Sequence, residues 1–336
     1  MGIDIFAVEP HKVSKDLRGY TILFYGEPKT GKTTTASKFE KNLILATETG
    51  YLAIPGVMAL PIQKWSEFKQ VLRQLKDPKA KETYYNITVD TSDLLFEQCE
   101  KYICNREGVE KVGDVPYGGG YTMVRKEFDE ALRSIPAMGF GLILISHSQE
   151  KTFKDETGNE YTRIAPTLAN QGRLVVDRMA DLIGYAHPEE DEDGNTYTRL
   201  YVRGTPRFIA GSRFRDIVPS FQFTYDNLVK AIGDAIDSEA AEHNNELVED
   251  VSKSNVYQEQ NVLDFNELMT NFKNLVSALQ TNVEKEEFKK KWAPKISSIT
   301  DKYLGKGKKV NECTEQQAEQ LSLIVDELTE LVGQGI

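Results

Sequence analysis

The chain carries the octapeptide Gly26-Glu27-Pro28-Lys29-Thr30-Gly31-Lys32-Thr33 directly after the apolar run Tyr20-Thr-Ile-Leu-Phe-Tyr25. The octapeptide fits the pattern G-x-x-x-x-G-K-[ST], in which glycines let successive backbone N–H groups turn inward around phosphate oxygens. The apolar run predicts a strand buried on both faces, and residues Lys32 to Lys41 predict a helix. This phosphate-binding motif requires a strand before the loop and a helix after it, so the sequence predicts a nucleotide site here.

Each part of the motif has an expected role in holding the nucleotide. The Lys32 ammonium is expected to reach the β- and γ-phosphates, and the Thr33 hydroxyl is expected to ligate Mg²⁺. The N-terminus of the predicted helix adds a partial positive charge at the same place. The predicted cofactors are therefore ATP and Mg²⁺. The predicted nucleotide-binding residues are Gly26, Glu27, Pro28, Lys29, Thr30, Gly31, Lys32, Thr33 and Thr34.

The acid that completes a site of this kind ends another apolar run, Ile87-Thr-Val-Asp90. Asp90 is expected to hold Mg²⁺ through water, and the alternative is an exposed acid that begins a turn. Thr91 stands where AAA+ ATPases usually carry their catalytic glutamate. The chain also lacks the NKxD segment with which GTPases read their base. The catalytic acid therefore has to lie elsewhere in the chain.

Two further apolar runs lead to candidate catalytic residues. Leu43-Ile-Leu-Ala46 leads to Glu48, which is expected to orient and deprotonate the attacking water. Gly141-Leu-Ile-Leu-Ile-Ser146 leads to His147, which is expected to sense the γ-phosphate. The alternatives are a solvated carboxylate at a strand end for Glu48 and a turn-capping histidine for His147. None of the four histidines is paired at metal-ligand spacing, so we expect no metal role for His147.

The rest of the chain predicts one α/β domain followed by a smaller helical part. Strands alternate with helices at first, and the later runs Leu182–Ala186, Arg199–Arg203 and Arg207–Ala210 predict an antiparallel edge, with a hairpin turn at Asp193–Asn195. Eight acids and one lysine between Asp234 and Gln260 predict a linker. Apolar residues then recur at helical spacing, at Phe265, Leu268, Phe272, Leu275 and Leu279, and at Leu321, Ile324, Val325, Leu328 and Leu331. The predicted division is an α/β domain over 1–235, an acidic linker over 236–260 and a helical module over 261–336.

Composition excludes several classes of protein. The 336 residues carry a net charge of −11, which excludes a strongly basic nucleic-acid coat but not binding through a local groove. Three cysteines without a CxxC pair predict neither a disulfide framework nor a zinc site, and they fit a reducing compartment. No apolar stretch suits a signal peptide or a membrane span, so the sequence predicts a cytoplasmic protein.

The segments GEPKTGKT, LILATETG, ITVDTSD, LILISHSQEK and RFIAGSRFRD together resemble the RecA-like ATPases encoded by bacteriophages. The most similar group is the phage nucleotide-binding proteins related to single-strand annealing recombinases of the Sak type. The resemblance covers residues 15–235 and implies a RecA-like P-loop NTPase core with a mostly parallel central sheet and an antiparallel edge. It implies that Glu48 is the catalytic base. It also implies that His147, where recombinases often carry glutamine, couples ATP to a DNA-binding loop.

The resemblance also points to two arginines that would act on a neighbouring subunit. Related ring-forming motors carry a lysine and an arginine after a late strand, and these side chains reach the neighbour's nucleotide. Arg213 and Arg215 stand at this place, without the lysine. We expect them at a strand end with no partner near their own Lys32, and the alternative is a local ion pair with Asp216.

Two segments lie where RecA-like proteins place DNA-binding loops, namely Arg106–Lys126 and Gln149–Arg178. Cations there would bind phosphates, and aromatic rings on mobile, glycine-rich backbone would stack on bases. The predicted DNA contacts are Tyr117, Tyr121, Lys151, Lys154, Arg163 and Arg173. The alternative is a solvated loop, because five basic and five acidic residues cancel between Gln149 and Ala180, and Thr152–Arg163 could form a plain surface hairpin.

The sequence thus predicts a Mg²⁺-dependent, RecA-like phage ATPase that acts on single-stranded DNA in recombination by annealing, or in replication, within the host bacterial cytoplasm. We expect a homo-oligomeric ring or filament whose helical module binds a single-strand-binding or replication protein. One alternative is a helicase-loader-like or regulatory ATPase that works through protein–protein contacts. Another is a small-molecule P-loop kinase, but the charge-balanced segment 149–178 makes a poor arginine-rich lid.

Overall fold

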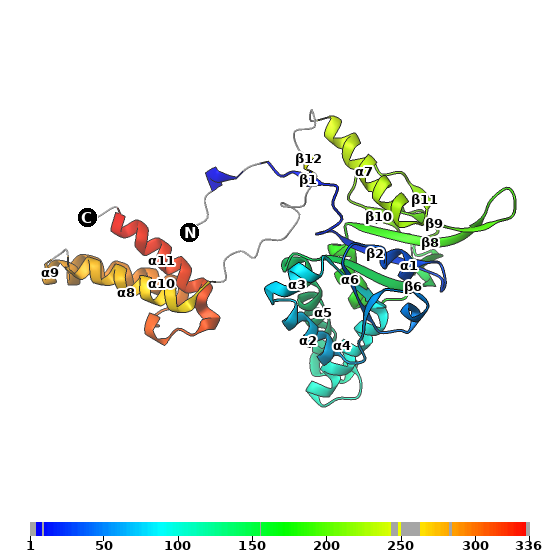
Figure 1. The fold of residues 1–336 in the computed structure, drawn as a ribbon. Coiled ribbons are helices and arrows are strands. Elements are labelled where there is room, and N and C mark those ends of the chain that lie inside the picture. Colours follow the sequence, from blue (N-terminus) through cyan, green and yellow to red (C-terminus); the bar gives the residue numbers. More distant parts are fainter. Residues whose placement is uncertain are drawn as a thin grey trace. The chain divides into compact units, whose positions relative to one another are not determined.

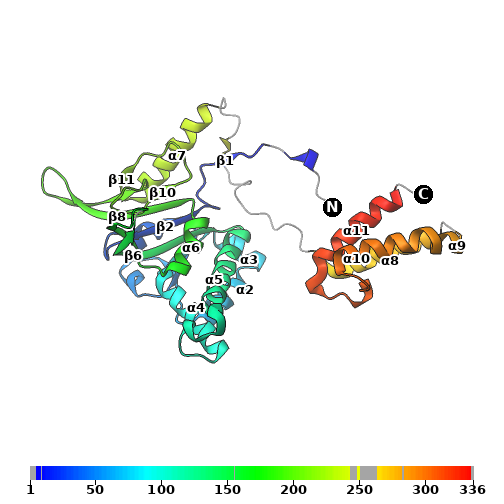
Figure 2. The ribbon, with the colours of Figure 1, turned by 180° about the vertical axis from the view of Figure 1, so that it is seen from behind.

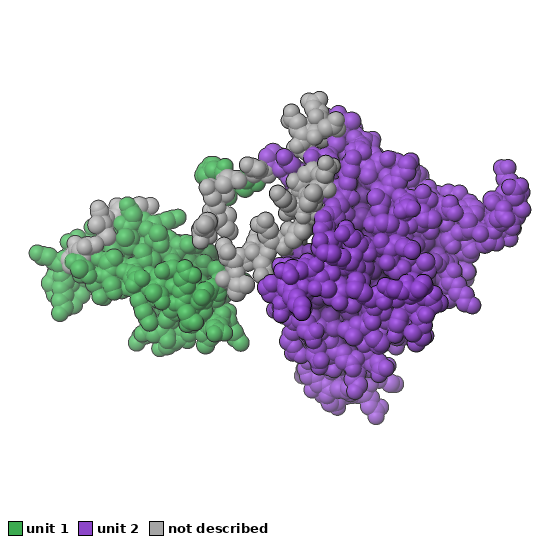
Figure 3. All heavy atoms as spheres, viewed as in Figure 1, with its two compact units in different colours: residues 1–8, 259–336 green, residues 9–258 purple. Residues whose placement is uncertain are grey.

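The computed structural model describes residues 5–8, 10–154, 156–242, 248–249, 263–281 and 284–333. The chain divides into two compact units, one of residues 9–258 and the other of residues 1–8 with 259–336 (Figure 3). The larger unit holds a mixed sheet covered by helices, and the smaller unit is helical (Figure 1).

The larger unit is built on a ten-stranded sheet in the order β11-β9-β8-β2-β6-β5-β3-β4, with β10 paired to β8 and β7 to β6. The strands from β8 to β4 in this order are all parallel, and the remaining strands pair in antiparallel fashion. The parallel strands are β2 (Thr21–Gly26), β3 (Asn42–Ala46), β4 (Met58–Pro61), β5 (Asn86–Asp90), β6 (Gly141–Lys154) and β8 (Leu182–Glu190). The others are β7 (Glu160–Pro166), β9 (Thr196–Tyr201), β10 (Gly211–Ser212) and β11 (Ser220–Gln222). This topology confirms the predicted RecA-like core with its mostly parallel sheet and antiparallel edge.

Both faces of the sheet are covered, as the continuous apolar strands predict. Side chains alternate along a strand, so Leu142 and Leu144 pack on one face while Ile143 and Ile145 pack on the other. The first face is covered by α2 (Trp65–Gln74), α4 (Ser92–Glu107), α5 (Gly119–Ala137) and α6 (Asn170–Met179). The second is covered by α1 (Lys32–Ala36) and α7 (Tyr225–Ala241).

Shorter elements connect these layers. They are the helix α3 (Pro78–Thr83), the 3₁₀ turns η2 (Gly50–Ala53), η3 (Val112–Asp114) and η4 (Pro116–Gly118), and the paired strands β1 (Val13–Ser14) and β12 (Val248–Glu249). In the described part of the chain, no helix has both the length and the apolar character that a bilayer crossing requires.

The structure departs from the sequence prediction at three places in this unit. The helix expected to reach Lys41 ends at Ala36. The run Arg207–Ala210 is not a strand, because its backbone pairs with Ile164 at the end of β7 instead of continuing the sheet edge. The predicted boundary at residue 235 falls inside α7, whose Ile236 and Ala240 are buried. Most of the predicted acidic linker lies outside the described residues.

The smaller unit contains the helices that the apolar spacing predicts (Figure 2). They are α8 (Phe265–Thr281) and α11 (Ala318–Gly333), and the sequence analysis did not predict α10 (Ala293–Leu304) between them. Its shorter elements are η1 (Ile5–Ala7), α9 (Lys285–Glu287), the π-helical turn η5 (Phe288–Trp292), η6 (Val310–Glu312) and η7 (Glu315–Gln317). Its core centres on Leu304, Leu321, Ile324 and Leu328. The apolar side chains of α8 pack against these residues.

Candidate nucleotide-binding site

The phosphate loop begins at the central strand of the sheet. Gly26, the last residue of β2, pairs with His147 of β6 on one side and with Ala186 of β8 on the other. A Cβ at Gly26 would overlap the carbonyl oxygen of Ala186, so the position requires glycine. Gly31, which precedes α1, has a φ of 81°, in the left-handed region that favours glycine. Both glycines of the motif are therefore needed for the shape of the loop.

The Lys32 side chain fills the curve of this loop. It is buried, and its Nζ donates to the carbonyl oxygens of Gly26 at 2.9 Å and of Glu27 at 2.6 Å. Burial lowers the pKa of Lys32 to about 8, although the charges of Asp90 and Asp93 act in the opposite direction. An anion in the loop would stabilise the ammonium that burial destabilises. The loop is therefore suited to a phosphate group.

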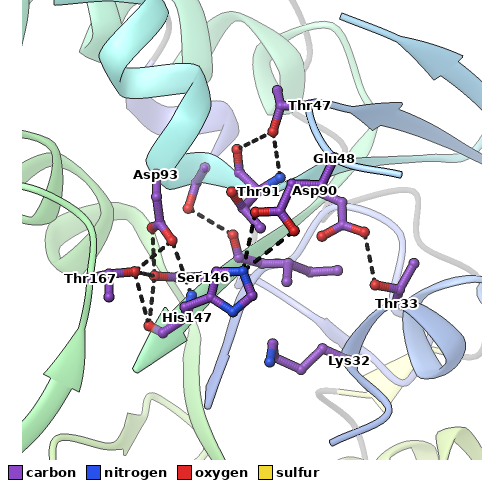
Figure 4. Close-up of polar contacts among 12 residues, drawn as sticks. Lys32, Thr33, Thr47, Glu48, Asp90, Thr91, Asp93, Ser146, His147 and Thr167 are labelled. Atoms are coloured by element: carbon purple, nitrogen blue, oxygen red, sulfur yellow. Dashed lines mark hydrogen bonds and ion pairs between the residues drawn. The ribbon is translucent and has the colours of Figure 1, made fainter. Parts of the chain in front are cut away.

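Thr33 and Asp90 form the pair that would hold Mg²⁺. The Thr33 hydroxyl donates to Oδ2 of Asp90 at 2.8 Å (Figure 4). Burial raises the pKa of Asp90, while the hydrogen bond from Thr33 lowers it. A hydroxyl and a carboxylate are the oxygen ligands that Mg²⁺ prefers, so these residues fit the ion. When bound and held by Thr33 and Asp90, Mg²⁺ would neutralise negative charge on the phosphates.

The helix dipole contributes less than the sequence suggests. Since α1 has five residues, its macrodipole is small. The positive charge at the loop comes instead from the buried Lys32 ammonium. Of the other predicted nucleotide-binding residues, Thr30 is buried and donates to the carbonyl of Glu27 at 2.9 Å. The side chains of Glu27, Pro28, Lys29 and Thr34 are exposed.

The structure brings Glu48 and His147 together. Nε2 of His147 lies 3.1 Å from Oε1 of Glu48 and 3.4 Å from Oε2. The two side chains, His147 and Glu48, are 31% and 35% exposed respectively, so both can meet water and a ligand. Asp90 is close enough that the charges of Glu48, Lys32 and His147 all influence its pKa. The carboxylates of Glu48 and Asp90 and the Lys32 ammonium thus share one end of the sheet with His147.

Sequence analysis missed Asp93, which holds the middle of β6, where the strand leaves the core and continues into the hairpin. Its Oδ1 accepts from the Ser146 hydroxyl at 2.6 Å, and its Oδ2 accepts from the His147 backbone N–H at 3.0 Å and from the Thr167 hydroxyl at 2.6 Å (Figure 4). The only sequence signal is an acid in the first turn of a predicted helix, which is ordinary at helix N-termini. Nothing local in the sequence points to partners 53 and 74 residues away.

Both predicted arginines form ion pairs within this chain, and the pair with Asp216 that stood as the alternative is formed by Arg215. Arg213 pairs with Asp181 at 2.8 Å and donates to the carbonyl of Arg178. Arg215 pairs with Glu242 at 2.6 Å and with Asp216 at 3.4 Å. Arg213 follows β10, which pairs with the first residues of β8, so it lies at the sheet edge opposite the phosphate loop.

The segment Gln149–Arg178 is a hairpin followed by a helix rather than a loop. In the β6–β7 hairpin Lys151 lies opposite Arg163, and Phe153 lies opposite Tyr161 with stacked rings. The Arg173 guanidinium, from α6, lies 5.7 Å from the Phe153 ring centre. Lys154 lies on the other face of the hairpin, because side chains alternate, and it pairs with Glu160 at 3.3 Å. We call the set Lys151, Phe153, Tyr161, Arg163 and Arg173 the hairpin face.

The two predicted tyrosines lie elsewhere. Tyr121 is in the first turn of α5, so the prediction that it lies on a mobile loop is wrong. A Cβ at Gly120 would overlap the Val112 carbonyl, which shows how closely this helix start is packed. Tyr117 is fully exposed and has a φ of 59°. It follows α4, whose 16 residues extend about 24 Å from the end of β5.

The chain is similar to a family of known proteins and to a relative from a prophage. Residues 18–214 match the family model described as AAA domain. The SPbeta prophage-derived uncharacterized protein YorG of Bacillus subtilis (strain 168) is 33% identical over 99% of this chain and 100% of its own length. The crystal structure of the flagellar accessory protein FlaH from Methanocaldococcus jannaschii aligns over 64% of this chain and 86% of its own, with 10% identity and a TM-score of 0.33. That likeness is too weak to assign a function.

The family match covers more than half of the chain, and it includes the phosphate loop, Glu48, Asp90 and His147. The chain therefore belongs to the AAA domain family and carries a P-loop ATPase domain. Thr91 still stands where AAA+ enzymes usually carry their catalytic glutamate.

Proposed function

We propose that this protein is a phage-encoded, Mg²⁺-dependent ATPase that acts on single-stranded DNA in recombination or replication. The observation that carries the ATPase proposal is the contact between Glu48 and His147 beside Thr33 and Asp90. It supplies a candidate general base on the same edge of the sheet as the phosphate loop. The prophage origin of the relative YorG supports the phage assignment.

In this proposal each side chain has one task. Lys32 leaves its two carbonyl acceptors and binds the β- and γ-phosphate oxygens. Glu48 accepts a proton from the attacking water, and His147 holds the Glu48 carboxylate in position and contacts the γ-phosphate. Hydrolysis removes the γ-phosphate and with it a contact of His147. The state of the nucleotide can therefore change the position of His147, which lies on the strand that continues into the hairpin.

The hairpin face supports the DNA part of the proposal. Two cations stand directly opposite each other at Lys151 and Arg163, an arrangement that is unfavourable unless an anion lies nearby. Burial, and to a smaller extent the charge of Arg173, lowers the pKa of Lys151. A phosphate would relieve this repulsion, and the neighbouring rings of Phe153 and Tyr161 suit a stacked base.

Assembly into a ring or filament is also part of the proposal. Arg213 follows β10, beside the first residues of β8, and the phosphate loop follows the last residue of β2. The two therefore lie at opposite ends of the parallel strands. In a head-to-tail contact, the edge of one copy that carries Arg213 would face the nucleotide of the next copy. The Arg213 side chain is 61% exposed and can leave Asp181, which keeps its hydrogen bond from the Thr21 backbone N–H. The helical module would remain available for a replication or single-strand-binding protein.

The test is the ATPase rate with and without single-stranded DNA, measured at two salt concentrations. Lys32→Ala should abolish turnover, and Lys38→Ala, a lysine just after α1, should leave the rate unchanged. Stimulation by DNA that weakens at high salt would support the DNA role. Stimulation by a replicative helicase alone would favour the loader-like alternative. Normal turnover in Lys32→Ala would overturn the site assignment.

A further inference from the structure

We propose that Asp93 is a positioning residue that holds Ser146 and His147 of β6 and links them to the returning strand of the hairpin. The inference rests on the proposed function, because it concerns how His147 meets Glu48. On the strand leading into the hairpin, Asp93 accepts from the Ser146 hydroxyl and the His147 backbone N–H. On the returning strand it accepts from the hydroxyl of Thr167, the residue that follows β7. Figure 4 shows these contacts converging on one carboxylate.

Asp93 is itself held firmly in place. It lies in the first turn of α4, three residues after Asp90, so it keeps a fixed position relative to the metal-binding acid. Its neighbour Ser92 is buried and donates to the carbonyl of Ile145 at 3.0 Å. The next turn of the helix buries Leu95 and Phe96 in the core. A carboxylate on such a support can act as a rigid anchor for the strand end.

The anchor places the His147 side chain. His147 donates its backbone N–H to Asp93, and its carbonyl accepts from the Thr167 backbone N–H at 2.9 Å. With both backbone groups held, the imidazole has little freedom except rotation about its own bonds. It then lies 3.1 Å from Glu48. Removal of the Asp93 carboxylate would take this acceptor from the Ser146 and Thr167 hydroxyls and the His147 N–H. It would thereby release the part of β6 that carries His147.

The same contacts connect the nucleotide to the hairpin face. The two hairpin strands meet at Ser148 and Pro166, directly beyond the groups that Asp93 binds. A displacement of the hairpin on binding DNA would pull on Thr167, and Thr167 shares Oδ2 of Asp93 with the His147 N–H. Asp93 is therefore the place where movement of the hairpin can alter the contact between His147 and Glu48.

The test uses the full chain with three substitutions and one control. Asp93→Asn keeps the size of the side chain but replaces one acceptor oxygen by an amide. Thr167→Val removes a single hydroxyl, and Thr167→Ser restores it. Asp129→Asn is the control, because Asp129 lies on α5 and pairs only locally with Arg133. Each variant is assayed for nucleotide affinity, kcat, stimulation by DNA and thermal unfolding.

Asp93→Asn should lower kcat on the order of 10–100-fold, as for a misplaced catalytic group, with nucleotide affinity changed by less than about threefold. Thr167→Val should reduce stimulation by DNA at least about threefold, and Thr167→Ser should recover it. The control should behave as wild type. Parallel losses of affinity, kcat and unfolding temperature in Asp93→Asn would mean a merely structural role and would overturn the inference.

A measurement without nucleotide separates this inference from the proposed function. The NMR signals of the His147 imidazole and backbone amide should shift in Asp93→Asn and remain unchanged in Asp129→Asn. If Lys32→Ala shows that the ATPase assignment is wrong, these signals still report whether Asp93 holds His147. Unchanged His147 signals in Asp93→Asn would overturn the positioning role even in an active enzyme.

Discussion

Glu48 and His147 meet across the end of a strand to which neither belongs. Glu48 follows β3 and His147 lies on β6, and β5 runs between these two strands in the sheet. The pair therefore spans the end of β5, where Asp90 holds the Thr33 hydroxyl. The Glu48 carboxylate is therefore close to Asp90 but takes no part in the hydrogen bond between Thr33 and Asp90.

Glu48→Gln should bind ATP within about threefold of wild type and hydrolyse it at least about 10²-fold more slowly. The amide keeps the shape of the side chain and a hydrogen bond to His147, but it cannot accept the proton of water. Single-turnover hydrolysis and a nucleotide-binding titration measure the two effects separately. Glu40→Gln, at an acid outside the site, is the control. A matching loss of binding and turnover would assign Glu48 a structural role.

ATP affinity should depend on the protonation of Lys32. In the free protein burial lowers the pKa of Lys32 to about 8, and a bound triphosphate favours the ammonium and raises that pKa. The free protein thus loses the proton as pH rises through about 8, and affinity should fall by up to about tenfold per pH unit above it. Binding titrations from about pH 7 to about pH 9.5, on either side of that pKa, measure the slope. Lys32→Arg stays charged and should give a flat profile, and an equal slope in both proteins would contradict the prediction.

Alanine at Lys151, Arg163 or Arg173 should weaken binding to single-stranded DNA. Removing each phosphate-binding side chain should also reduce the salt dependence of the affinity by about 0.7 in log–log slope. Fluorescence anisotropy at several salt concentrations measures both quantities. Lys154→Ala is the matched comparison, because Lys154 lies on the opposite face of the same hairpin and pairs with Glu160. Equal effects at Lys151 and Lys154 would show that the hairpin face does not bind DNA specifically.

Arg213→Ala should lose activity in a way that a second copy can restore. If Arg213 acts on the nucleotide of the next subunit, a mixture with Lys32→Ala protein contains sites with both an intact loop and an intact arginine. An arginine supplied in this manner contributes about 10³–10⁵-fold in rate. The measurement is the ATPase rate of the mixture against each variant alone. Persistent inactivity, in a preparation shown to exchange subunits, would leave Arg213 only its pairing with Asp181.

The candidate site could be predicted from sequence where a polar residue follows a short apolar run. Asp90, Glu48 and His147 all have this signature, since parallel strands end at a common edge of the sheet. The structure brings all three together, along with Lys32. The Gly-rich loop could also be predicted, because few other structures require its spacing of glycines, lysine and threonine.

The rest of the site depends on contacts between distant residues. Arg215 pairs with Glu242, 27 residues away, and no local sequence pattern predicts that ion pair. The strand β4 was missed because Met58 and Leu60 are exposed at the sheet edge and show no buried apolar run. The outer half of β6 was foreseen only in the alternative of a surface hairpin over Thr152–Arg163, because its residues from Ser148 to Lys154 are mostly polar and lie outside the core.

The place of β2 in the sheet has a consequence for how the chain is made. Its two neighbours, β6 and β8, begin at Gly141 and Leu182, long after Gly26 has left the ribosome. At about 5–20 residues per second, synthesis needs roughly 8–30 s to travel from Gly26 to Ala186. For that time the apolar run Thr21–Gly26 lacks at least one of its two strand partners and is open to chaperones or to aggregation. The loop at the end of β2 is thus translated well before the two strands that support it.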